Sequence, residues 1–87
     1  MVNFMMSKEL VNDDYFITSD LSLAAALVAW DSPIIEIDKT DFRKALFTFQ
    51  NTSELTKNIK AYWDDSKLIL PRRYFYSLKE LKSRLYA

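Results

Sequence analysis

Residues 21–30 constrain the fold of this chain more than any other segment. They read Leu-Ser-Leu-Ala-Ala-Ala-Leu-Val-Ala-Trp, and the three consecutive alanines and three leucines favour a helix. Ser22 is the only polar residue, so other elements should cover this helix on almost every side. Ser19 and Asp20 are good N-cap residues, and Pro33 disfavours helix in the residue before it. We therefore predict a central helix whose alanines let neighbouring elements approach closely.

Two isolated segments on either side of this helix have the composition of strands. Residues 15–18 are aromatic and β-branched, and residues 34–38 read Ile-Ile-Glu-Ile-Asp. In the second segment, alternation puts Ile35 and Ile37 on one face and the other three residues on the opposite face.

A third strand is predicted over residues 44–50, where Ala45, Phe47 and Phe49 share one face. The polar residues 39–43 indicate a turn. The second and third strands should therefore form an antiparallel hairpin.

An amphipathic helix follows the hairpin. Asn51 and Glu54 have capping-box spacing, and Thr52 and Ser53 are alternative caps. The helix carries an apolar stripe of Leu55, Ile59, Tyr62 and Trp63. We interpret the stripe as core, with Trp63 at its rim; the alternative is a groove for a partner.

A last helix should begin at Pro71, which suits a first helical turn, and run to Tyr86. Its predicted inward residues are Tyr74, Phe75, Leu78, Leu81 and Leu85.

These elements predict an α+β fold, with a small three-stranded sheet packed against about three helices in β-α-β-β-α-α order. Residues 1–12 show no clean period and are interpreted as a flexible or short helical N-terminal segment. Residues 13–87 should form one domain.

The chain has no His, no Cys and no Gly. The usual general base near neutral pH, thiolate chemistry and glycine-rich phosphate loops are therefore absent. The acidic pairs Asp13-Asp14 and Asp64-Asp65 lack the spacing of a calcium loop, and Glu36 is expected to face solvent or pair with Lys44. We predict no enzyme activity, no cofactor and no metal site.

Charge is divided unevenly along a chain of zero net charge. Residues 1–42 hold two lysines and eight acids, whereas residues 43–87 hold ten basic residues and four acids. The split indicates either a polar interaction surface or two halves that face each other and partly neutralise. No apolar run reaches the roughly 18 residues of a membrane span, and residues 1–6 lack the features of a signal peptide. We expect a cytoplasmic protein that does not enter a membrane.

The polar face of the last helix is the candidate binding site. At 100° per residue, Tyr76 lies opposite the apolar set, among cations. The candidate residues are Arg72, Arg73, Tyr76, Lys79 and Ser83. An exposed aromatic among cations can stack on a base while the cations contact phosphate, or it can anchor an acidic protein. A solvated basic face is the alternative, because helix C-termini favour cations.

The run Tyr-Phe-Ile-Thr-Ser-Asp-Leu-Ser-Leu-Ala-Ala-Ala-Leu at residues 15–27 resembles a family of small uncharacterised bacterial and mobile-element proteins. Its pattern is Tyr-x-[Thr/Ser]-[Thr/Ser]-Asp-Leu-x-Leu-Ala-Ala, followed by a hairpin with an aromatic strand. Ala-Tyr-Trp at residues 61–63 and Leu-Lys-Ser-Arg-Leu-Tyr at residues 81–86 are similar to its later motifs. The resemblance covers residues 15–86 and implies a compact domain of unknown function, encoded by a bacterium, phage or mobile element, without known catalytic residues. Relatives often have a Gly near residues 30–32, and this chain has none.

We therefore predict a small non-enzymatic interaction module that binds a protein partner or a second copy of itself. The alternative is a weak nucleic-acid-binding accessory protein, and a sequence pI near 6.2 counts against it. A small hydrolase-like enzyme ranks last.

Overall fold

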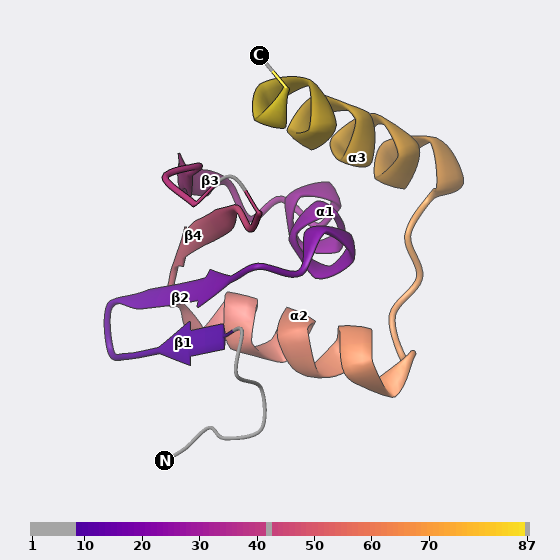
Figure 1. Ribbon diagram of the computed structural model, residues 1–87. Coiled ribbons are helices and arrows are strands. Elements are labelled where there is room, and N and C mark those ends of the chain that lie inside the picture. The colour runs from indigo at the N-terminus through magenta and orange to yellow at the C-terminus, as the bar shows by residue number, and fades with distance from the viewer. Residues whose placement is uncertain (1–8, 42, 87) are drawn as a thin grey trace.

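The computed structural model describes residues 9–41 and 43–86 (Figure 1). In these ranges four strands form one antiparallel sheet in the order β1-β2-β4-β3, and three helices pack with it. The elements are β1 (Glu9–Val11), β2 (Tyr15–Thr18), α1 (Leu21–Ala29), β3 (Ile34–Asp38), β4 (Leu46–Gln50), α2 (Ser53–Asp64) and α3 (Pro71–Leu85). The predicted α+β class, three helices and β3–β4 hairpin are confirmed, whereas the predicted strand number is wrong by one.

The additional strand is β1, in a segment where we expected a tail or a short helix. It pairs antiparallel with β2, with Leu10 opposite Ile17. The turn between them is held by Asn12, whose side-chain Oδ1 accepts from the backbone N–H groups of Asp14 at 2.8 Å and of Tyr15 at 2.7 Å. This local side-chain bonding reverses the chain and permits the pairing. Residues 1–8 of the predicted N-terminal segment lie outside the described residues.

Helix α1 is the most buried helix, as predicted, and lies between α2 and α3 (Figure 1). Its N-cap is Asp20, which accepts from the backbone N–H of Leu23 at 3.1 Å. The core joins α1 to the sheet and to one residue each of α2 and α3: Phe16, Leu23, Ala24, Ala25, Leu27, Phe47, Phe49, Leu55 and Leu81. The short alanine side chains allow the close approach that the sequence predicted.

Strand β3 departs from regular alternation. Its register against β4 shifts between Ile34, which pairs with Phe49, and Glu36, which pairs with Thr48. Ile35 therefore lies at a bulge and is 52% exposed, whereas Ile34 and Ile37 pack against the core. The prediction that Ile35 and Ile37 share a face is wrong, because the extra residue reverses the alternation.

Helix α2 begins at the alternative cap Thr52, whose Oγ1 accepts from the backbone N–H of Leu55 at 3.0 Å. Leu55 is buried, and Ile59 and Tyr62 pack against the core. Trp63 is 51% exposed, in agreement with its predicted place at the rim. Residues 66–70 then connect α2 to α3 without regular structure. Within the described ranges, no helix has the length and apolar character needed to cross a bilayer.

Candidate functional site

Helix α3 brings four of the five candidate residues into one exposed line. Arg72, Tyr76, Lys79 and Ser83 have the spacing i, i+4, i+7 and i+11, which follows one face of a helix, and each is exposed. The opposite face of α3 packs against the core through Tyr74, Leu78, Leu81 and Leu85. The hydroxyl of Tyr74 also donates to the carbonyl oxygen of Ser22 at 3.4 Å. Packing on α1 thus leaves the basic face of α3 outward.

Arg73, the fifth candidate, lies apart from this line. Its Nη2 donates to Oδ1 of Asp31 at 2.8 Å. Asp31 follows α1 in the left-handed region, with a φ of 73°. A glycine would adopt this conformation without steric cost, whereas this chain has an aspartate there, and its carboxylate pairs with the first turn of α3. Arg73 therefore pairs with the segment after α1 and is directed away from the outer line.

Phe75 joins the exposed face, although the sequence predicted it inward. Its side chain is 55% exposed and that of Tyr76 57%, and the two ring centres lie 5.9 Å apart. Lys79 Nζ lies 5.6 Å from the centre of the Phe75 ring, within the range of a cation–π contact. We call Arg72, Phe75, Tyr76, Lys79 and Ser83 the α3 outer face.

A signal for the orientation of Phe75 was present in the sequence. Tyr74, Leu78, Leu81 and Leu85 already form a complete stripe without it. The structure also buries Ser77, a small residue that allows close packing. A narrower stripe centred on Leu78 and Leu81 would have placed Phe75 outside.

The connector between α2 and α3 directs its lysine toward Asn58 and Trp30 and exposes its two leucines. Lys67 Nζ donates to Oδ1 of the buried Asn58 at 2.7 Å, and it lies 5.1 Å from the centre of the Trp30 ring. Trp30 Nε1 donates to the carbonyl oxygen of Leu68 at 3.0 Å. In contrast, Leu68 is 94% exposed and Leu70 is 67% exposed.

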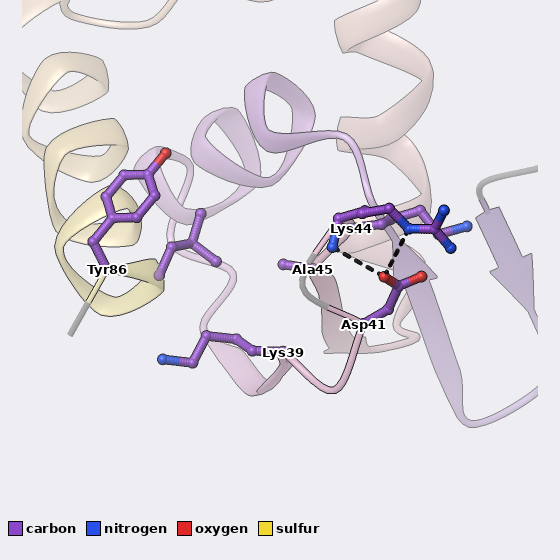
Figure 2. Close-up of a pocket in the computed structure, with 7 residues that line it drawn as sticks. Lys39, Asp41, Lys44, Ala45 and Tyr86 are labelled. Atoms are coloured by element: carbon purple, nitrogen blue, oxygen red, sulfur yellow. Dashed lines mark hydrogen bonds and ion pairs between the residues drawn. The ribbon is translucent and has the colours of Figure 1, made fainter.

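A surface hollow of about 420 Å³ lies where the β3–β4 loop meets the end of α3 (Figure 2). Lys39, Lys44 and Arg43 contribute cations to its wall. Two of these are engaged, because Lys39 Nζ donates to the carbonyl oxygen of Arg84 at 3.0 Å and Arg43 Nε lies 3.5 Å from Asp41 Oδ1. The hollow therefore adds no clear anion site.

The acidic candidates are dispersed. Asp13 and Asp14 are exposed in the β1–β2 turn, and Asp64 and Asp65 lie at the end of α2. Across residues 9–41 and 43–86, no three acidic side chains are grouped as metal ligands would be. Glu36 is exposed on β3.

Comparison with curated proteins and with solved structures gives no match. A family model does match, over residues 13–87, a range that contains α1, the β3–β4 hairpin and the whole α3 outer face. The chain therefore belongs to the family described as Domain of unknown function (DUF5659).

Proposed function

We propose that this domain is a non-enzymatic binding module that recognises a protein partner through the α3 outer face. The observation that carries the proposal is the exposed pair of rings, Phe75 and Tyr76, with Lys79 over one of them. Aromatic residues are favoured anchors at protein interfaces, because they bury a large area at a small cost in conformational entropy.

The partner surface that fits this face is apolar with carboxylates around it. Phe75 and Tyr76 supply the apolar contact, while Arg72 and Lys79 supply positive charge at the same surface. Carboxylates of a partner would be attracted to these cations and would steer its approach.

A protein ligand is favoured over nucleic acid by the charge of the chain. Arg73 is paired with Asp31 and so contributes little net charge to a phosphate backbone. The whole chain has zero net charge, whereas dedicated nucleic-acid-binding proteins are usually basic.

Cross-linking from the α3 outer face tests the proposal. A benzoylphenylalanine in place of Tyr76 should capture one protein in the host, whereas the same residue in place of Lys57, exposed on α2, should not. The captured protein is then purified and titrated with the full chain by calorimetry. The double variant Tyr76→Ala, Lys79→Ala should bind about tenfold more weakly or worse, a loss of about 1.4 kcal/mol or more. Lys57→Ala should bind like the parent.

Two results would overturn this proposal. One is equal binding of the purified partner by the parent and the double variant. The other is tight binding of a DNA or RNA oligonucleotide with a salt dependence that Arg72→Ala, Lys79→Ala flattens, because that result assigns the face to phosphate contact.

The same proposal includes a role in binding without catalysis and a location in the cytoplasm. The absence of His, Cys and Gly supports a role in binding rather than catalysis. The lack of Cys also suits a reducing compartment, so we place the module in the cytoplasm of a bacterium or of a cell that carries a phage or mobile element.

A further inference from the structure

The edge of the molecule formed by residues 63–73 exposes several large apolar side chains. Leu68, Leu70 and Trp63 are 94%, 67% and 51% exposed, respectively. In Figure 1 this edge runs from the end of α2 to the start of α3, on the side of the molecule away from the β1–β2 turn. Large apolar side chains that gather in one exposed segment indicate an interaction surface.

The exposed leucines are carried on an anchored backbone. The side chain of Lys67 contacts Asn58 and Trp30, and the Trp30 indole donates to the carbonyl oxygen of Leu68. These contacts hold the connector against α1 and α2 while Leu68 points outward. Binding through Leu68 would therefore cost less conformational entropy than binding through a loose loop.

At both ends of the connector, the charged side chains have the same sign as the helix dipole beside them, which is unfavourable. Asp64 and the C-cap Asp65 lie at the negative end of α2, and Arg72 and Arg73 lie in the first turn at the positive end of α3. Opposite charges supplied from outside would stabilise both helix ends.

Part of this charge is neutralised within the molecule. Lys60 pairs with Asp64 at 2.6 Å, and Asp31 pairs with Arg73 at 2.8 Å. Asp65 and Arg72 form no ion pair with any residue in the described ranges. The edge thus has one acidic end and one basic end, each with a charge available for a partner.

We propose that a second copy of this chain docks on this edge to form a two-fold symmetric homodimer. A two-fold axis reverses the direction of the edge, so the acidic end of each copy meets the basic end of the other. We place the axis at the Leu68–Ile69 peptide bond, because Asp65 and Arg72 are equally far from it along the chain. In this proposed arrangement Asp65 of each copy faces Arg72 of the other, and the two Leu68 side chains lie at the centre.

The dimer is independent of the proposed function, because the edge and the α3 outer face share only Arg72. Phe75, Tyr76 and Lys79 need no place in the dimer contact. Each surface can therefore be removed without the other.

Sedimentation velocity of the full chain over a dilution series tests the dimer. The parent should sediment as a dimer at high concentration, and Leu68→Asp should weaken association at least about tenfold. The matched control is Leu10→Asp, the same change at a leucine that is 65% exposed on β1, away from the edge. It should dimerise like the parent.

Charge reversal tests the register of the two copies. Asp65→Lys and Arg72→Glu each put like charges at both contacts of a homodimer, so each alone should sediment as a monomer. Mixed in equal amounts, they place opposite charges at both contacts and should form a heterodimer. Circular dichroism checks that every variant is folded.

Three outcomes would overturn the proposal: a parent that is monomeric at every concentration, equal dimerisation of the Leu68 and Leu10 variants, or charge variants that stay monomeric when mixed. None of them changes the test of the α3 outer face, which uses Tyr76 and Lys79 variants and a different protein.

Discussion

The guanidinium of Arg73 lies 2.8 Å from Oδ1 of Asp31, and this contact joins the first turn of α3 to the second residue beyond the end of α1. The two residues come from the basic and the acidic halves of the chain. Their side chains are 52% and 79% exposed, so water screens the pair. The contact therefore links the two helices but adds little to the stability of the fold.

We expect this pair to contribute little to the free energy of unfolding. A double-mutant cycle with Arg73→Ala and Asp31→Asn should give a coupling energy of about 0.2–1 kcal/mol, as for other exposed ion pairs. Asn tolerates the left-handed backbone at position 31, so the cycle isolates the charge. Urea denaturation at low and high salt measures the coupling, which should fall as salt rises. A coupling that is large and indifferent to salt would contradict this view.

The two faces of α3 should respond very differently to truncation. Leu81 is 1% exposed, so Leu81→Ala should lower the free energy of unfolding by about 2–5 kcal/mol. Phe75 is 55% exposed, so Phe75→Ala should cost about 1 kcal/mol or less. Denaturant unfolding of both variants checks the comparison. Equal losses would mean that α3 is rotated from the orientation described above.

The sequence predicted the elements whose signal is local. Local apolar patterns indicated the buried residues of three elements. These patterns are the apolar run of α1, the alternation of Phe47 and Phe49 in β4, and the apolar stripe of α2. Asp20 was one of two predicted caps for α1, and Thr52 was an alternative to Asn51 for α2, because an N-cap needs only its own side chain and the next turn of backbone.

The features that were missed depend on pairing between strands, which the pattern of a single strand does not record. Strand β1 has only three residues, too few for a period, and its turn is also held by Asn51, whose Nδ2 donates to the carbonyl oxygen of Asn12 at 2.6 Å. The bulge at Ile35 arises in pairing with β4, which no local pattern of β3 reveals. These positions were decided by tertiary contacts.

Every residue of the α3 outer face except Phe75 was predicted. Arg72, Tyr76, Lys79 and Ser83 follow from helical spacing alone. Phe75 was placed inward because apolar residues are usually buried, whereas the rotation of α3 is set by packing around the small buried Ser77. The pairing of Arg73 with Asp31 also joins helices whose contact the sequence did not predict.

Asp65 offers a route to higher stability. As the C-cap of α2 it has a φ of 59°, a left-handed conformation that glycine adopts at lower cost. Asp65→Gly should raise the free energy of unfolding by about 0.5–1 kcal/mol. Its neighbour Asp64 is helical, so Asp64→Gly should instead lower it by about 1 kcal/mol.

Both glycine variants are best compared by urea denaturation in the Leu68→Asp background, so that self-association does not contribute. A loss of stability in both would show that residue 65 does not hold the left-handed backbone in solution.

Tyr62 should make the fold sensitive to alkaline pH. Burial of the phenol against the core raises its pKa above the usual value, and the nearby Asp20 carboxylate adds to the effect. The unfolded chain then loses this proton near pH 10, while the folded chain keeps it to a higher pH. Because the unfolded state binds fewer protons there, stability falls as pH rises through about 10 and is unaffected well below it.

Tyr62→Phe removes the ionising group, so its melting temperature should fall less than that of the parent between about pH 9 and pH 11. Tyr86→Phe, at a ring that is 80% exposed, is the matched control and should behave like the parent. Thermal unfolding followed by circular dichroism measures all three proteins, and identical alkaline profiles for Tyr62→Phe and the parent would refute the assignment.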